Sequence, residues 1–400
     1  MELSPATLPA ITISRAGAIR WKNGHPWIYR SDLRSPIDSL PTAGAVPVAD
    51  ERGKRLGWAD FSPRSEIALR RLSFDPAAVI DREFWRQRLG DALAWRQRIV
   101  SESEAFRWIA GEADGLPGLI VDVYGTALSY QITTSAMAAR ETELQALLSE
   151  LFSPSVLAAR HDARVRLQEG LPIQSSLIAG ESSLVRARVN GLEMEWDLMS
   201  GQKSGGFLDQ RENWRALAAW ARPGMDCLDG FTYQGGFALH LAARGARVQA
   251  VDFSRAALER AERNAALNHL NTMEWIEANA FDLLREYDLE RRQFDLVVLD
   301  PPAFAKSRAA LAAARRGYKE INLRALKLLR PGGILASCSC SHHMSESMLL
   351  EVIAEAAMDA RRRLKVLERR TQALDHPVLL TVPETHYLKC LIFLVDELNY

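Results

Sequence analysis

The run Asp300-Pro301-Pro302 places an acidic residue directly after a short apolar segment. Residues 296–299 are four consecutive apolar residues, which is typical of a strand buried on both faces of a parallel sheet. Proline cannot donate a hydrogen bond to a sheet, so this strand is expected to end here. Ligands of open α/β sheets bind just beyond the carboxyl ends of the strands, where Asp300 is expected. The run alone is weak evidence, because many strands end at a proline turn without binding a ligand.

Three other expected strands also end in residues that suit a ligand. The first ends in Asp229 and continues as a glycine-rich turn to Gly236, at the start of an expected helix. A leading carboxylate repels a diphosphate and attracts a cation, so this turn is not the glycine fingerprint of dinucleotide-binding folds. The second ends in Asp252, placed to hold a ribose diol, and the third in Asn279, placed near an adenine edge. The set indicates a site for S-adenosylmethionine (SAM).

Two cysteines, Cys338 and Cys340, follow the fifth strand of this series, and alternation puts them on one side if the strand extends that far. They can be inert small hydrophobic residues, the commonest role of free cysteine. They can bind a metal with His342 and His343, although the usual Cys-x-x-Cys spacing is absent. One of them can be a nucleophile beside Asp300, because neighbouring strands share an end. The residues alone leave these three interpretations open.

A glycine-rich turn at residues 198–214 precedes the whole series. Its small residues allow close approach of the backbone to a ligand, and Lys203 and Asp209 can supply charge and a carboxylate acceptor. The alternative is a domain linker with a polar helix start.

The elements that position these residues alternate between strand and helix, which predicts a doubly wound parallel sheet. The expected strands are residues 225–229, 247–251, 273–277, 294–299 and 334–337, followed by two closing strands at 364–368 and 386–395. The turn Pro331-Gly-Gly333 is expected to precede the fifth of them. The expected helices are residues 236–244, 254–270, 280–287, 307–329 and 345–362.

Two smaller domains are expected before this sheet. Residues 1–75 are β-rich, with strands at 10–13, 46–49, 56–59 and 67–72, and carry eleven basic against eight acidic residues. Interleaved aromatics (Trp21, Trp27, Tyr29, Trp58, Phe61) suit an RNA-binding surface, and the alternative is a solvated surface around a small core. Residues 76–195 read as an α+β domain, with helices at 81–101 and 140–151 and strands at 127–133 and 184–189.

Composition sets wide limits. The chain has 400 residues, enough for two or three domains, and 50 basic and 50 acidic residues, a balance that neither supports nor excludes a nucleic-acid partner. Its four cysteines are irregularly spaced, which favours a reducing cytoplasm over a disulfide framework. The first residues do not resemble a secretory signal, and no apolar run approaches the ~20 residues of a membrane span.

Over nearly its whole length the chain resembles the RlmI-like 23S ribosomal RNA 5-methylcytosine methyltransferases. The run at residues 20–29 is similar to a PUA domain, a small barrel that binds structured RNA in its relatives. The motifs that carry the family resemblance are residues 24–27, 111–118, 201–213, 229–237, 300–304, 316–322, 339–341 and 375–378.

The resemblance implies an α/β fold: a Rossmann-like class I methyltransferase domain at 196–400, an N-terminal PUA β-barrel at 1–75 and a central α+β domain at 76–195. It implies that Cys340 is the nucleophile, that Cys338 is not, and that Asp300, Pro301 and Pro302 hold the target base. It also implies SAM as cofactor, 23S ribosomal RNA as partner and no metal, and leaves a homodimer open. The implied cofactor-binding residues are Lys203, Phe207, Asp209, Asp229, Phe231, Tyr233, Gly235, Gly236, Asp252, Phe253, Asn279, Ala280 and Asp300.

The residues also bear on three rival functions. A methyltransferase acting on an exocyclic amine favours an aromatic residue directly after the two prolines, whereas here Ala303 precedes Phe304. An RNA-binding assembly factor would keep the fold without catalysis. An NAD-dependent dehydrogenase is disfavoured by Asp229.

Overall fold

A computed structural model describes residues 9–35, 42–305 and 307–398. The chain forms two compact units. The first unit comprises Met1–Arg188, Trp196–Phe207 and Leu374–Thr385, and the second comprises Val189–Glu195, Leu208–Ala373 and His386–Tyr400. The domain boundaries expected from the sequence stay predictions. The first residues of the chain, which were predicted not to form a secretory signal, lie outside the described residues. None of the described helices is long and apolar enough to cross a bilayer.

The first unit begins with a five-stranded sheet in the order β1-β3-β4-β5-β2. Its strands are β1 Ile11–Ile13, β2 Trp27–Tyr29, β3 Gly44–Asp50, β4 Arg55–Phe61 and β5 Ile67–Ser73. An isolated bridge between Ile13 and Leu33 links β1 to the segment after β2, so the two edges of the sheet approach each other. The sequence pattern predicts four of these strands. It misses β2 and the helix α1 (Arg15–Lys22), because three residues and two helical turns are too short to show a period.

The aromatic residues of this sheet divide into two groups. Trp21, Trp58 and Phe61 are buried, and the indole of Trp21 donates a hydrogen bond to the carbonyl oxygen of Leu56 at 3.1 Å. These three are core residues, so the RNA-stacking role expected for them is wrong: a sheet this small needs large side chains to fill its interior. Trp27 and Tyr29 are only half-buried.

A second sheet of the first unit has the order β10-β9-β8-β7-β6. Its strands are β6 Ala105–Ala110, β7 Leu119–Tyr124, β8 Ala127–Ile132, β9 Val156–Ala159 and β10 Ser176–Ala179. The helices around it are α2 Arg82–Ile99, α3 Ser135–Ala138, α4 Glu141–Phe152 and α5 Val165–Gln168. A hairpin of β11 (Leu184–Val189) and β12 (Leu192–Asp197) follows. Two bidentate ion pairs, Arg140 with Asp60 and Arg107 with Asp122, fix these elements in place.

The second unit contains a seven-stranded sheet in the order β15-β14-β13-β16-β17-β19-β18. The strands are β13 Asp226–Asp229, β14 Arg247–Asp252, β15 Met273–Glu277, β16 Phe294–Leu299, β17 Leu329–Ser339, β18 Arg362–Arg370 and β19 Lys389–Glu397. Its first five strands in chain order pair in parallel, and β19 runs antiparallel between β17 and β18. The predicted doubly wound α/β sheet is therefore confirmed, and the carboxyl ends of five strands meet at one edge.

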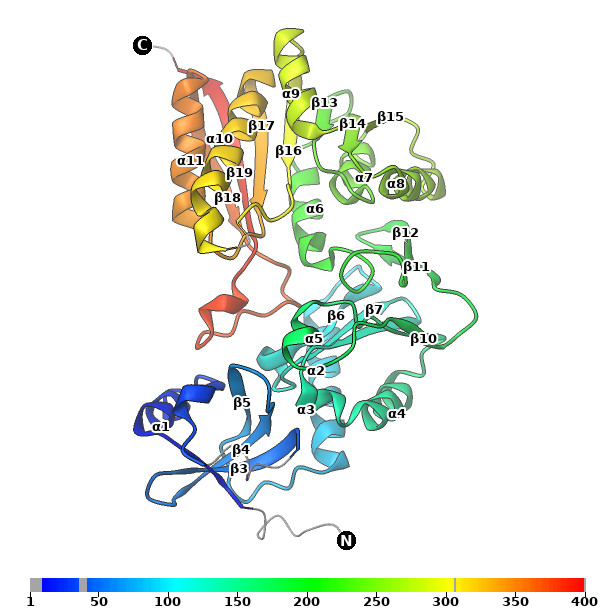
Figure 1. The fold of residues 1–400 in the computed structure, drawn as a ribbon. Helices are drawn as coiled ribbons and strands as arrows, with labels where there is room; N and C mark the ends of the chain where they lie inside the picture. Colours follow the sequence, from blue (N-terminus) through cyan, green and yellow to red (C-terminus); the bar gives the residue numbers. More distant parts are fainter. Residues whose placement is uncertain (1–8, 36–41, 306, 399–400) are drawn as a thin grey trace. The chain divides into compact units, whose positions relative to one another are not determined.

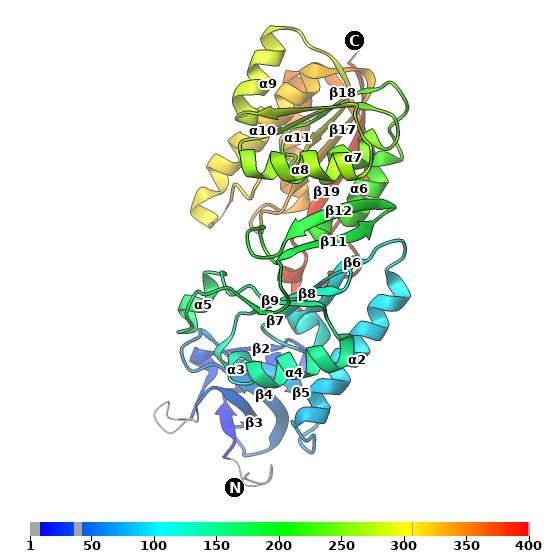
Figure 2. The same ribbon diagram turned by 90° about the vertical axis from the view of Figure 1, so that its right-hand side faces the viewer.

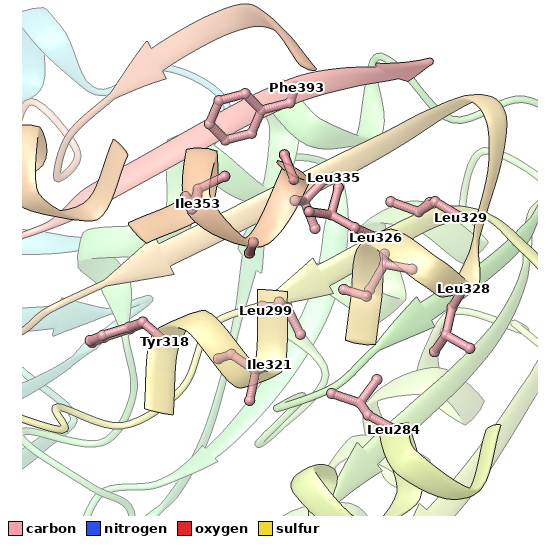
Figure 3. Close-up of a cluster of buried hydrophobic side chains, with 14 of the residues drawn as sticks. Leu284, Leu299, Tyr318, Ile321, Leu326, Leu328, Leu329, Leu335, Ile353 and Phe393 are labelled. Atoms are coloured by element: carbon pink, nitrogen blue, oxygen red, sulfur yellow. The ribbon is translucent and has the colours of Figure 1, made fainter. Parts of the chain in front are cut away.

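Helices cover both faces of this sheet (Figures 1 and 2). On one face lie α6 (Arg211–Ala218), α7 (Gly236–Ala242) and α8 (Arg255–Leu267), and on the other α9 (Ala280–Leu289), α10 (Leu311–Leu328) and α11 (Glu346–Asp359). Figure 3 shows the second layer, where Ile321 and Ile353 pack against Leu299, Leu335 and Phe393 of the strands. Each such side chain contributes ~1.5–3 kcal/mol by its burial. This core holds β16 and β17 rigidly, and with them the residues that follow each strand.

Several boundaries differ by a few residues from the sequence-based expectation, such as the start of α10 at Leu311, and two further differences concern β17 and β19. The turn expected at Pro331-Gly-Gly333 lies inside β17, where the pairing register with β16 shifts between Phe294 and Leu296 and Gly332 has a φ of 79°. A bulge within a strand resembles a turn in sequence, since both use glycine and proline. The closing strand expected from residue 386 begins only at Lys389.

Candidate cofactor and nucleophile site

The loop after β13 is anchored to both neighbouring strands. The amide of Gly230 donates to Val298 of β16, and the amide of Thr232 donates to Val251 of β14. The loop then turns through Tyr233 (φ 50°) and Gly235 (φ 88°) into helix α7. The glycine-rich turn predicted after Asp229 is therefore a compact loop at the carboxyl edge of the sheet.

Asp229 lies beneath this loop and is fully buried. The amide of Ala238 donates to its Oδ2 at 3.2 Å, while Oδ1 is buried and accepts no hydrogen bond of ordinary geometry from the described residues. Burial raises the pKa of Asp229 to about 7. A buried carboxylate with an open acceptor fits a cationic ligand, such as the ammonium group of SAM, which would supply the missing donor and favour the ionised form.

Gly235 and Gly236 are required for reasons of conformation and packing. Gly235 has the left-handed φ that glycine adopts without strain. A Cβ on Gly236 would lie 2.4 Å from an atom of the Trp214 indole. The resemblance implies that Gly236 binds the cofactor, and the structure gives α6–α7 packing as a sufficient reason for glycine at this position.

Replacing Gly236 with alanine is therefore expected to lower the free energy of unfolding by about 1–3 kcal/mol through overpacking against the rigid indole. Chemical denaturation of the variant measures this change. Gly90 in α2 is the matched control, because a Cβ there meets no atom within 4 Å and its φ is not positive, so alanine at this position is expected not to destabilise the protein. An unchanged stability of Gly236→Ala would show that Trp214 moves aside freely.

The ends of β14 and β15 carry the next predicted residues. Asp252 accepts hydrogen bonds from the amides of Tyr233 and Ser254, both at 2.9 Å, and its burial raises the pKa of its carboxyl. Phe253 follows it with 74% of its surface exposed, an uncommon position for a large apolar ring. Asn279 uses its Oδ1 to cap helix α9 by accepting from the Phe281 amide at 2.9 Å, and Ala280 is the first residue of that helix. Phe231 is half-buried against the core.

Asp300 lies directly after β16, with Pro301 buried and Pro302 exposed. A chain of side chains holds it: Gln210 Nε2 donates to Asp300 Oδ2 at 2.9 Å, and Asn213 donates to Gln210 Oε1 at 2.6 Å. Arg370 Nε donates in turn to Asn213 Oδ1 at 2.9 Å. Side chains next to and within α6, together with Arg370 of β18, thus orient the Asp300 carboxylate. No pattern in the sequence indicates that Gln210 or Arg370 takes part.

Cys338 and Cys340 have different surroundings. Cys338 is fully buried opposite Cys390 of β19, and its hydrogen bond with that thiol, together with burial, raises its pKa. Strand β17 ends at Ser339, so Cys340 lies beyond it and is partly exposed. The strand does not extend to Cys340, so the condition under which alternation would put the two cysteines on one side is not met. A buried thiol with a raised pKa is a poor nucleophile, which favours Cys340 over Cys338 for that role.

The two serines that flank Cys340 are both held by Tyr318. Its hydroxyl lies 2.8 Å from Ser339 Oγ and 3.1 Å from Ser341 Oγ, and Ser341 Oγ also accepts from the amide of Ala305. Tyr318 extends from α10 at the edge of the core in Figure 3. It interacts electrostatically with both Cys340 and Asp300, so the two lie around one side chain. The pairing of Leu299 with Ser337 puts Asp300 level with Cys338, two residues before Cys340.

The remaining predicted cofactor residues, Lys203, Phe207 and Asp209, precede helix α6 in the chain. Asp209 is buried, and its Oδ2 accepts a hydrogen bond from the Tyr387 hydroxyl at 2.7 Å. Lys203 and Phe207 belong to the first unit, where the Lys203 ammonium lies 4.6 Å from the centre of the Phe207 ring. The structure does not bring Lys203 and Phe207 together with the strand-end residues within one unit. Their cofactor-binding role stays a prediction.

Sequence reasoning missed Lys389, the first residue of β19, which is 3% exposed. Its Nζ donates to the carbonyl oxygens of Ser341 at 2.8 Å and Tyr387 at 2.9 Å. Burial lowers the pKa of Lys389 to about 8, although Cys340 and Glu346 oppose the shift. No local sequence pattern marks this lysine. Across the described residues, no three His, Cys, Asp or Glu side chains converge as a metal site.

Comparisons with known proteins agree with this arrangement. Residues 133–393 match the model of the S-adenosylmethionine-dependent methyltransferases, and residues 11–74 match that of a PUA-like domain. Ribosomal RNA large subunit methyltransferase I of Tolumonas auensis is 40% identical over 92% of this chain and 94% of its own. The protein of the same name from Shewanella frigidimarina is 39% identical, with the same coverage.

Solved structures share the fold at low identity. A methyltransferase complexed with S-adenosylhomocysteine (SAH) superposes with a TM-score of 0.81 at 18% identity, covering 96% of this chain and 99% of the other. A SAM-dependent methyltransferase from Streptococcus mutans gives a TM-score of 0.80 at 17% identity, with the same coverage. The predicted fold class and cofactor are confirmed. This chain belongs to the family of ribosomal RNA large subunit methyltransferase I, within the SAM-dependent methyltransferases.

Proposed function

We propose that the protein methylates carbon 5 of a cytosine in large-subunit (23S) ribosomal RNA through a covalent adduct with Cys340. The position of Cys340 carries the proposal: it lies at the end of β17, held through Ser339 and Ser341, beside the strand that delivers Asp300. The relatives are named as large-subunit ribosomal RNA methyltransferases, which supports the class of substrate. Such a reaction would take place in the cytoplasm.

The chemistry follows from the weak nucleophilicity of cytosine at carbon 5. Attack of the Cys340 thiolate on carbon 6 makes carbon 5 enamine-like. Asp300, oriented by Gln210, would accept a hydrogen bond from the exocyclic amine and, when it carries a proton, donate that proton to the ring nitrogen, where it would stabilise the negative charge that develops on the ring. SAM, when bound, supplies a methyl group on a sulfonium. After transfer, a base removes the carbon 5 proton and the carbon–sulfur bond breaks, which releases the Cys340 thiolate and the methylated base.

The residues that would hold SAM are those at the ends of β13, β14 and β15. Asp229 would offer the buried acceptor, and Asp252 would bind the ribose hydroxyls from the end of β14. Asn279 and Ala280, at the start of α9, would meet the adenine, and the exposed ring of Phe253 offers it an apolar face. Gly235, Phe231 and Tyr233 shape the loop between them.

Phe304 argues against methylation of an exocyclic amine. Its ring lies 4.7 Å from the ring of Tyr318 and 5.7 Å from that of Phe281, centre to centre. A ring that packs in this way is not free to stack on a flipped base, which is the role an aromatic residue would have in the rival reaction.

Bisulfite sequencing of 23S ribosomal RNA tests the proposal. In a strain that lacks the gene, one 5-methylcytosine is expected to disappear, and the wild-type gene on a plasmid should restore it. Methylation of an exocyclic nitrogen, detected by mass spectrometry of nucleosides, would exclude the proposed reaction. Unaltered ribosomal RNA together with a defect in subunit assembly would favour the non-catalytic alternative.

A further inference from the structure

Residues 316–322 form a motif of the family resemblance to which the proposed reaction assigns no role. They lie in α10, where Tyr318 is fully buried. A Cβ on Gly317 would lie 3.3 Å from an atom of the Phe304 ring, so glycine lets that ring lie close to the helix. Asn322 Nδ2 donates to the carbonyl oxygen of Tyr318 at 2.8 Å, one turn farther along α10. The motif therefore brings Phe304 against α10 beside Tyr318.

The side chain of Tyr318 contacts both segments that the reaction uses. Its ring lies 4.7 Å from the ring of Phe304, centre to centre, in the loop that follows β16. Its hydroxyl lies 2.8 Å from Ser339 Oγ and 3.1 Å from Ser341 Oγ, the residues on either side of Cys340. Both serines are fully buried, so no water replaces a lost hydroxyl partner. One side chain thus joins residues 339–341, the nucleophile segment, to the loop after β16.

Main-chain groups strengthen this connection. The amide of Ala305, in the loop after β16, donates to Ser341 Oγ at 3.2 Å, so Ser341 contacts that loop and Tyr318 at once. From β19, Lys389 Nζ donates to the carbonyl oxygen of Ser341 at 2.8 Å. Strand β17 ends at Ser339, and the chain leaves the sheet there. These contacts therefore fix its path beyond the strand.

We propose that Tyr318 is a positioning residue for the nucleophile: by binding both neighbouring serines, its hydroxyl sets the place of Cys340 relative to Asp300. The inference rests on the proposed nucleophilic role of Cys340. Attack on carbon 6 requires the sulfur at about 3–3.5 Å from that carbon while Asp300 holds the same base, and a displacement of about 1 Å can slow such a step by about 100-fold. Tyr318 stays neutral in this role, because one hydroxyl can donate to one serine and accept from the other.

Tyr318→Phe keeps the ring against Phe304 and removes only the hydroxyl. Its single-turnover rate of methyl transfer, at saturating SAM and ribosomal RNA from a strain lacking the gene, is expected to fall by about 10- to 100-fold. SAM affinity is expected to stay close to wild type, because the residues assigned to the cofactor follow β13, β14 and β15. Ser341→Ala should cause a similar fall, and the double variant should be little slower than either single variant, because both changes remove the same contact.

Two matched controls separate positioning from a loss of stability. Tyr130→Phe removes another buried tyrosine hydroxyl, which donates to Glu141 at 2.7 Å in the first unit. Ser337→Ala removes a hydroxyl of β17 that is buried without a hydrogen-bond partner among the described residues. Both controls are expected to keep the wild-type rate per SAM-binding site. An equal fall in the controls, or an unchanged rate of folded Tyr318→Phe, would overturn the proposal. If Tyr318→Phe does not fold, Ser341→Ala decides by the same criteria.

Hydrogen exchange gives a second measurement that does not depend on methyl transfer. The amide of Ser341 donates to Ser339 Oγ at 3.3 Å, and the amide of Met344 donates to the carbonyl oxygen of Ser341 at 3.1 Å. Both amides are expected to exchange about tenfold faster in Tyr318→Phe, because the segment is released. A slower reaction without faster exchange would overturn the positioning role. Faster exchange together with an active Cys340→Ala variant would keep the contact and reject the covalent reaction.

Discussion

Cys340→Ala is expected to lower methyl transfer to ribosomal RNA by at least ~10³-fold while leaving SAM binding close to wild type. The loss is large because carbon 5 of cytosine cannot attack a methyl donor until a nucleophile adds to carbon 6. The retained binding follows from position: Cys340 follows β17, whereas the residues assigned to the cofactor follow β13, β14 and β15. Tritiated-methyl incorporation into ribosomal RNA from a strain lacking the gene measures the first effect, and calorimetry the second.

Cys338→Ala is the matched control for this experiment. Cys338 has the same residue type two positions earlier, but its thiol is buried against Cys390. The substitution is expected to retain most of the activity and to lose a little stability from the small cavity. Full activity of Cys340→Ala would refute the covalent reaction, and loss of activity in Cys338→Ala alone would exchange the roles of the two cysteines.

The alternation of strands and helices could be predicted because each central strand, such as β16, is a short apolar run that ends in a polar residue. The elements missed are those without such a period. Strand β2 has three residues, and the bulge in β17 resembles a turn in sequence. Composition leaves open whether Trp21, Trp58 and Phe61 belong to a small core or to an RNA-binding surface, and only their burial shows that they are core residues.

The residues of the candidate site also fall into those that the local sequence predicts and those that it does not. Asp229, Asp252 and Asp300 could be found because a residue that follows a strand of a parallel sheet has a known place. Lys389 and Gln210 could not be predicted, because both are far away in sequence from the residues they contact. Lys389 lies beside Ser339 through the pairing of β19 with β17, and Gln210 contacts Asp300 from the turn before α6. Local patterns predict which residues end the strands, and only the tertiary structure shows which side chains orient them.

Asp229→Asn is expected to weaken SAM binding by about 10- to 100-fold and, at the same time, to stabilise the free protein. The binding loss corresponds to about 1.5–3 kcal/mol, the usual worth of a hydrogen bond to a charged group. The gain in stability follows from the raised pKa. Because burial raises the pKa of Asp229 to about 7, the folded state binds a proton between pH 4 and 7 that the unfolded state has released. The wild type therefore loses stability as pH rises through this range, and asparagine removes that loss.

Thermal unfolding without SAM should show the largest stabilisation of Asp229→Asn at pH 8, shrinking as pH falls toward 4. The wild type should bind SAM more weakly below pH 7, by up to tenfold per pH unit, because a protonated carboxyl cannot neutralise the ammonium of the cofactor. Asp226, at the other end of β13, is the control: against the effect of burial, hydrogen bonds from Arg247 and Arg330 lower its pKa. Asp226→Asn should therefore leave SAM affinity unchanged and destabilise the protein at pH 8. A wild-type SAM affinity that stays constant from pH 6 to 8 would mean that Asp229 is already ionised, and that burial in the free protein does not hold its proton.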